Sequence, residues 1–132
     1  MRMNRFQVAA LVALSFSPTT LARITYNTVD PMAVLTDDGR HLIVTGPIEC
    51  TPGERAYLAV TVSQRTTGAI AEGRGIATCT GLTQQWDVNL EFQGREVFDD
   101  GPALAVAIAR TTMHGVATDA HQWLVPVTLI DE

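Results

Sequence analysis

The sequence predicts an all-β domain, specifically an antiparallel, immunoglobulin-like β-sandwich of about seven strands with one disulfide. Apolar and polar residues alternate with a period of two in most segments, and Gly, Pro, Asp and Thr interrupt these segments about every ten residues. Apolar residues at helical spacing are not found over a comparable length, so no crossover helix is expected. Short strands without crossover helices favour a sandwich over a barrel or a βαβ fold.

The amino-terminal 22 residues are arranged like a secretory signal peptide, which leaves residues 23–132 as one mature domain. Two arginines precede an apolar run from Phe6 to Phe16, and the small residues Thr20 and Ala22 lie just before the expected cleavage. This run of 11 residues is too short for a membrane-spanning helix, which needs about 20. The protein is therefore expected to be secreted, with no membrane span in the mature chain.

The mature domain is acidic and has no lysine. The whole chain has nine arginines against 14 acidic residues, a formal net charge of -5, and removal of Arg2 and Arg5 makes the charge -7. Binding to nucleic acid or to an anionic membrane needs basic surface, so neither is predicted. The charge does not define a substrate, and a monomer is expected.

Cys50 and Cys79 are the only cysteines, and both lie in the mature domain. In a small exported domain this pair predicts a disulfide, because thiols outside the cell are not kept reduced. Free buried thiols and a redox or metal role are the alternatives. A zinc site needs about four ligands, and the sequence has no Cys-x-x-Cys and no histidine near either cysteine. No metal or other cofactor is predicted.

The first two predicted strands form a hairpin. Residues 32–35 and the strand from His41 to Cys50 flank Thr36-Asp37-Asp38-Gly39, whose Asp-Gly pair is typical of a tight turn. The second strand is expected to be half-buried. Its inward residues are Leu42, Val44, Ile48 and Cys50.

Three further strands are predicted at residues 55–65, 74–81 and 85–93. The inward residues of the first are Ala56, Leu58, Val60 and Val62. The third strand alternates most clearly, with Asp87, Asn89 and Glu91 on its polar side. Its apolar side consists of Trp86, Val88, Leu90 and Phe92. We therefore expect Trp86 in the core.

The last two strands are predicted at residues 103–111 and 122–130. The first of these alternates bulky residues with alanines, and we expect the bulky residues to face the core and the alanines to face solvent. Because alanine is the best helix former, a helix is the alternative for this segment. In the last strand Trp123 belongs to the inward set. Pro126 has no backbone N–H donor and therefore predicts an edge strand.

If the strands at 55–65, 103–111 and 122–130 share a sheet, their outward residues form a flat, weakly apolar and almost uncharged face. We expect a binding site on this face. Its predicted residues are Tyr57, Ala59, Thr61, Ala103, Ala105, Ala107 and Leu124. Two alternatives stay open: the alanines are tolerated on an outer face or covered by a loop, and an exposed Tyr57 serves as a stacking platform for a sugar.

No constellation of residues predicts catalysis. The sequence lacks Gly-x-Ser-x-Gly, His-Glu-x-x-His and a glycine-rich phosphate loop followed by a helix. The nearest approach to a ligand cluster is His114, Asp119 and His121, in a predicted loop between the last two strands. This loop is the alternative site, where a small extracellular enzyme or an inhibitor would act.

Several short motifs resemble a known family. They are Thr45-Gly46-Pro47-Ile48-Glu49-Cys50, Val62-Ser63-Gln64-Arg65, Thr78-Cys79-Thr80-Gly81, Trp86, and the closing stretch Ala117-Thr118-Asp119-Ala120-His121-Gln122-Trp123. The pattern resembles small exported β-sandwich proteins of unknown function from high-GC Gram-positive bacteria, over most of residues 30–130. The resemblance implies an immunoglobulin-like fold with a paired-cysteine bridge. It implies no activity, substrate or catalytic residue.

Together these observations predict a secreted binding or structural module and not an enzyme. The expected partner is a protein or a component of the cell envelope, engaged through the flat sheet face. The alternatives are an enzyme or inhibitor acting through residues 114–121 and a carbohydrate-binding module using Tyr57.

Overall fold

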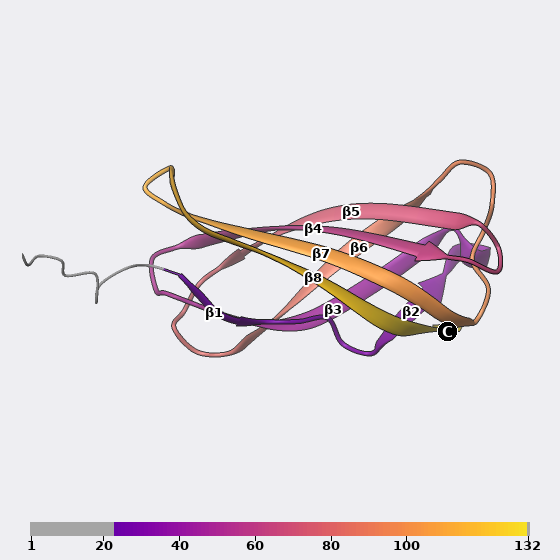
Figure 1. Cartoon of the computed structure of the whole chain (residues 1–132), viewed down its shortest axis with the longest axis horizontal. Helices are drawn as coiled ribbons and strands as arrows, with labels where there is room; N and C mark the ends of the chain where they lie inside the picture. The colour runs from indigo at the N-terminus through magenta and orange to yellow at the C-terminus, as the bar shows by residue number, and fades with distance from the viewer. Residues whose placement is uncertain (1–22, 132) are drawn as a thin grey trace, which may run out of the picture.

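The computed structural model describes residues 23–131, which contain eight strands, one 3₁₀ turn and no α-helix. In chain order the elements are β1 (Ile24–Asn27), β2 (Met32–Thr36), η3 (Asp37–Gly39), β3 (His41–Cys50), β4 (Arg55–Gln64), β5 (Ala69–Thr78), β6 (Gln84–Gln93), β7 (Gly101–Met113) and β8 (Val116–Asp131). Figure 1 shows the strands running along the long axis, with the β7–β8 turn and β1 at one end and the carboxyl terminus at the other. The all-β prediction is confirmed for these residues.

Seven of the described strands close into one ring. Each is hydrogen-bonded to the next in the order β3, β2, β8, β7, β4, β5, β6, and β6 pairs again with β3. The remaining strand, β1, adds to the Cys50 end of β3. Among the described strands all pairings are antiparallel except that of β2 with β8. The predicted sandwich leaves its two sheets unjoined, whereas this ring connects them.

Two short ladders make these connections. β5 pairs with β6 only between residues 70–72 and 91–93. β2 first pairs with β3 and then runs parallel to β8, with residues 32–35 opposite residues 128–131. Each ladder supplies hydrogen-bond partners to strands that would otherwise be sheet edges. The two sheets of the predicted sandwich are therefore joined into one ring. Strands β5, β4, β7 and β8 pair along most of their lengths and form the larger continuous sheet.

Most of the predicted strands lie where the alternation places them. The strand predicted at His41–Cys50 is β3, with every second residue buried, and the strand predicted at 85–93 is β6. The predicted hairpin is confirmed, because β2 and β3 pair antiparallel across the 3₁₀ turn. β5 begins at Ala69, five residues before the predicted start at Arg74. The four-residue strand β1 is absent from the prediction, since so short a segment shows no clear alternation.

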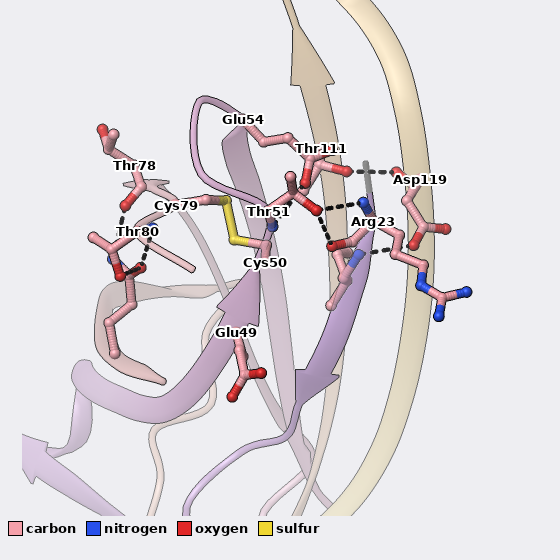
Figure 2. Close-up of a disulfide and its surroundings, with 12 residues drawn as sticks. Arg23, Glu49, Cys50, Thr51, Glu54, Thr78, Cys79, Thr80, Thr111 and Asp119 are labelled. Atoms are coloured by element: carbon pink, nitrogen blue, oxygen red, sulfur yellow. Dashed lines mark hydrogen bonds between the residues drawn. A yellow bond between two sulfur atoms is a disulfide. The ribbon is translucent and has the colours of Figure 1, made fainter. Parts of the chain in front are cut away.

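The predicted disulfide joins Cys50, the last residue of β3, to Cys79, which follows β5, with a Cα–Cα distance of 5.3 Å. Both cysteines are buried. Beside the bridge, the backbone N–H of Gly81 donates to the carbonyl of Cys50 and that of Cys79 to the carbonyl of Glu54, both at 3.0 Å. Figure 2 shows the bridge between the β3 end and the segment after β5. The predicted disulfide is therefore confirmed, and it holds the ends of two strands together.

The two tryptophans differ in burial. Trp86 lies in the core, as predicted, and its indole N–H donates to Oδ1 of Asn27 at 3.1 Å. Trp123 is only partly buried. It packs against the core and stacks on the His121 ring, with the ring centroids 5.4 Å apart.

Pro126 lies on a stretch of β8 that has one neighbouring strand. It is opposite Leu104 of β7, and β2 joins the other edge of β8 only from Thr128 onward. This position suits proline, because proline has no N–H to donate to a second neighbouring strand.

The predicted signal peptide, residues 1–22, lies outside the described residues. Within residues 23–131 there is no helix long and apolar enough to cross a membrane.

Candidate binding face

The outward side of β4 carries the first part of the predicted face. Tyr57, Ala59 and Thr61 alternate with buried residues and are each partly exposed. Leu124 on β8 also points outward and is 64 % exposed. β7 lies between β4 and β8 in the sheet. These four predicted residues therefore share one face of a continuous sheet.

The predicted outward placement of the alanines on β7 is wrong. Ala105 and Ala107 are fully buried, and Ala103 is partly buried against the core. The bulky residues Leu104 and Ile108 are instead 39 % and 44 % exposed. The strand itself is confirmed, but its two faces are exchanged relative to the prediction.

The neighbouring strands explain this exchange. Ala107 lies between Val60 of β4 and Trp123 of β8, and Ala105 lies between two valines in the same way. These large neighbours fill the interior beside β7, so only a small side chain fits inward there. The bulky residues of β7 consequently point toward solvent.

The outward residues of β5, β4, β7 and β8 form a surface that we call the Tyr57 face. It consists of Glu72, Arg74, Ile76, Tyr57, Ala59, Thr61, Val106, Ile108, Arg110, Ala120, Gln122 and Leu124. The register aligns these residues in rows across the sheet. Tyr57 lies between Ile76 and Arg110, and Ala59 lies between Arg74 and Ile108. The face is thus more apolar than predicted, and it also carries arginines.

A hollow of about 590 Å³ lies beside Tyr57 on this face, and we call it the arginine pocket. It is lined by Tyr57, Leu58, Ala59, Arg74, Gly75, Ile76, Ile108, Arg110 and Ala120. The guanidinium carbon of Arg110 lies 5.6 Å from the centre of the Tyr57 ring, which is a cation–π distance. Two cationic side chains therefore border an otherwise apolar hollow.

Tyr57 also lines a second, smaller hollow of about 340 Å³, which contains Arg55, Thr112 and His114. The two hollows thus meet at the tyrosine. A third hollow, of about 590 Å³, lies near the other end of β4 and has Arg65 as its one charged residue.

The two hollows that meet at Tyr57 are lined by no carboxylate. Within the described part of the chain, the single ion pair joins His121 to Asp119, so Arg55, Arg74 and Arg110 have no carboxylate within 4.0 Å. Glu72 is the acidic residue of the Tyr57 face, and it lines a neighbouring hollow together with Arg74. A domain that is acidic overall therefore concentrates three of its arginines around one tyrosine.

Arg74 lies between two glycines where β5 passes close to β6. A Cβ atom on Gly73 would lie 2.2 Å from the carbonyl oxygen of Asn89, and one on Gly75 would lie 2.9 Å from a methyl group of Val88. Because neither glycine has a side chain, β5 approaches β6 closely here. Arg74 is absent from the predicted face, although glycines on both sides of it are a signal of close backbone approach.

The alternative site at residues 114–121 is a turn and a strand, and not a loop. His114 and Gly115 form a two-residue turn with positive φ at both positions, and Asp119 and His121 lie on β8. Among residues 23–131 no three His, Cys, Asp or Glu side chains are grouped so that they could hold a metal ion. His114 instead lines the smaller hollow beside Tyr57.

The Asp119 carboxylate is held by several donors. Its Oδ2 accepts from the backbone N–H of Ile24 at 2.9 Å and lies 3.1 Å from Nε2 of His121, while Oδ1 accepts from the N–H of Ala120. Burial raises the pKa of Asp119, but the N–H groups of Ile24 and Ala120 and the His121 imidazole outweigh it. The pKa is therefore below its ordinary value of 3.8.

No protein-family model and no curated protein matches the chain. Among solved structures the chain is similar to a β-glucuronidase from glycoside hydrolase family 2, with a TM-score of 0.44 and 11 % sequence identity. The likeness covers 80 % of this chain and 12 % of that enzyme, so the chain spans only a small part of its length.

Proposed function

We propose that this protein is an exported, non-enzymatic binding module whose Tyr57 face engages a protein partner. The observation that carries the proposal is a set of exposed aliphatic residues on this face. Ile76, Ile108 and Leu124 are 63 %, 44 % and 64 % exposed. Large aliphatic side chains gathered on one sheet surface form an apolar patch, and burying such a patch against a partner is favourable.

The aliphatic character of the face favours a protein over a carbohydrate. Sugars stack on aromatic rings, and Tyr57 is the one aromatic residue among those that define the Tyr57 face. Its ring already has the Arg110 guanidinium at cation–π distance. Protein interfaces combine aliphatic side chains with polar and charged ones, and this face carries both kinds.

The non-enzymatic role is proposed because Asp119 and His121 already have structural partners. Asp119 accepts hydrogen bonds from the N–H groups of Ile24 and Ala120, and among the described residues no hydroxyl or thiol is hydrogen-bonded to His121. Nucleophilic hydrolysis needs a nucleophile beside the histidine. We assign this pair to holding β1 against β8.

Export is proposed from the signal-like sequence together with the disulfide, since disulfides persist mainly in oxidising compartments. The immunoglobulin-like class and the kinship with small exported proteins of high-GC Gram-positive bacteria are also proposals. The immunoglobulin-like class is supported by the antiparallel pairing of β3 with β6 and of β7 with both β4 and β8. The kinship rests on the sequence motifs alone.

Site-specific photo-crosslinking tests the proposed face. A photoreactive phenylalanine at Leu124 is compared with the same residue at Asp87, which is exposed on β6 outside the Tyr57 face. In the producing cells we expect one crosslinked protein adduct at position 124 and none at position 87. The added substitution Ile108→Thr should strongly reduce the yield of this adduct while leaving the melting temperature unchanged.

The partner identified by mass spectrometry is then purified and titrated against the mature protein. We expect Ile108→Thr to weaken its binding about tenfold, as for a residue near the centre of an interface. Equal adducts at positions 124 and 87, no adduct at either, or an adduct that consists of carbohydrate would each contradict the proposal.

A further inference from the structure

We infer that the arginine pocket is a carboxylate-binding subsite of the Tyr57 face, and that it receives an acidic side chain of the protein partner. The inference rests on the proposed function, because it names the chemistry of the partner at that same face.

The register places the two arginines diagonally across β4. Arg74 on β5 is opposite Ala59 of β4, and Arg110 on β7 is opposite Tyr57, two residues along the same strand. Both side chains line the same hollow, and so does the small residue Ala59. A bulkier residue at position 59 would take up part of this hollow. A carboxylate has room to enter there.

Neither arginine is neutralised within the described part of the chain. Arg110 contacts the Tyr57 ring and Arg74 has no ion-pair partner there, so the donors of both guanidinium groups are available. A guanidinium group presents its N–H donors in a fixed fork that matches the two oxygens of a carboxylate. The ring of Tyr57 further limits where the Arg110 head can lie, which reduces the entropy lost when it binds.

The apolar lining of the pocket strengthens the attraction. Ile76 and Ile108 stand beside the two arginines, and docking of a partner on these residues excludes water from the hollow. Coulombic attraction and charge-assisted hydrogen bonds are stronger where water is excluded. The expected ligand is therefore an acidic side chain flanked by aliphatic ones.

Glu72 limits the strength of this site. It lies on the same face, two residues before Arg74, and lines a neighbouring hollow together with that arginine. As a carboxylate it competes for the Arg74 guanidinium and repels an incoming acid. Its removal should increase the affinity for an acidic ligand, which a nonspecific apolar patch does not predict.

A pair of peptides tests the inference. The probes are acetyl-Leu-Glu-Leu-Glu-Leu-amide and its counterpart with both glutamates replaced by glutamine, titrated by NMR into the mature protein at low salt. We expect the glutamate peptide to bind at least fivefold more tightly and to shift the Arg74 and Arg110 side-chain signals. The double variant Arg74→Gln, Arg110→Gln should remove this preference, and Glu72→Gln should increase it.

Arg95→Gln is the matched control, since Arg95 is exposed in the segment between β6 and β7, away from the pocket. It should leave the preference intact. Equal affinity for the two peptides, or a preference that survives the double variant, overturns the inference. Tighter binding of trigalacturonate or of inorganic phosphate than of the glutamate peptide also overturns it, and identifies an acidic polysaccharide or a phosphate ligand instead.

The two proposals can fail separately. Crosslinking at Leu124 reports on the apolar part of the face and uses neither arginine. A specific protein adduct at Leu124 together with equal peptide affinities removes only the carboxylate subsite. Absence of that adduct removes the proposed function, whatever the peptides show.

Discussion

Glu54 and Thr118, 64 residues apart in the chain, are joined by a hydrogen bond in which the Thr118 hydroxyl donates to Oε2 of Glu54. Glu54 is only 1 % exposed, and its Oε1 accepts from the backbone N–H of Thr51 at 3.1 Å. The Thr118 oxygen also lies 2.9 Å from that of Thr111. Figure 2 shows Glu54 reaching toward Thr111 beside the disulfide. This network ties the β3–β4 connection to the first residues of β8.

Loss of the Thr118 hydroxyl should destabilise the fold. Thr118→Val keeps the shape of the side chain but leaves an oxygen of the buried Glu54 without its donor, at a cost of about 1–3 kcal/mol. Urea unfolding followed by fluorescence measures the change. Thr128→Val is the matched control on the exposed side of the same strand, and it should change stability by no more than about 0.5 kcal/mol. Equal effects of the two substitutions would contradict the role assigned to the network.

The disulfide should contribute a large share of the stability. Cys50 and Cys79 are 29 residues apart, and closure of such a loop in the unfolded chain is worth about 3–4 kcal/mol. Reduction should therefore lower the melting temperature by roughly 10 °C or more. Calorimetry with and without reductant measures the difference. The protein should also show no free thiol under denaturing, non-reducing conditions, and two reactive thiols per chain would refute the bridge.

The inward face of β7 should reject larger side chains. Ala107 is fully buried between Val60 and Trp123, so Ala107→Leu should overpack the interior and cost about 1–3 kcal/mol. Ile108→Thr, at the next position, keeps a β-branched residue on the outward face and should be nearly neutral. Chemical unfolding of both variants compares them. A tolerated leucine at position 107 together with a destabilising change at position 108 would reverse the assignment of the two faces.

Asp119 should stabilise the protein in a pH-dependent way. Its pKa in the folded state is below the ordinary value of 3.8, so its contribution is complete above that value and is lost as the pH falls through the folded-state pKa. Wild type should therefore exceed Asp119→Asn in melting temperature at pH 7, and the gap should narrow below about pH 4. The comparison is repeated with His121→Gln in both proteins, which removes titration of the imidazole. If the difference in melting temperature between wild type and Asp119→Asn is the same at pH 7 and pH 2.5, the negative charge of Asp119 does not contribute to stability.

Much of the fold could be predicted from local pattern. Alternation in β3 and β6 correctly placed Leu42, Val44, Val88 and Leu90 in the core, because a strand has only two faces and bulky apolar residues belong to the buried one. The closure of the ring could not be predicted. It depends on pairing between β2 and β8, which are about 95 residues apart, and no local pattern specifies which distant edge a strand will join.

The candidate site was predictable only in part. Tyr57, Ala59 and Thr61 are outward, as expected, since β4 shows a clear alternation of large and small or polar residues. The contribution of Arg74 and Arg110 to the same hollow required the register of β5, β4 and β7. Residues from three strands line this hollow, and their spacing along the chain does not indicate that they are neighbours in the fold.

By itself, the sequence determined that residues 23–131 form short strands and that the only two cysteines pair, because both follow from local periodicity and composition. Only the tertiary structure decided which side of β7 is buried. A strand that alternates alanine with leucine, valine and isoleucine can be built with either set inward, and burial of the bulky set would be the better choice for an isolated strand. In the folded ring Val60 and Trp123 already fill the interior beside Ala107, so the volume left by neighbouring strands, and not hydrophobicity alone, selects the alanines.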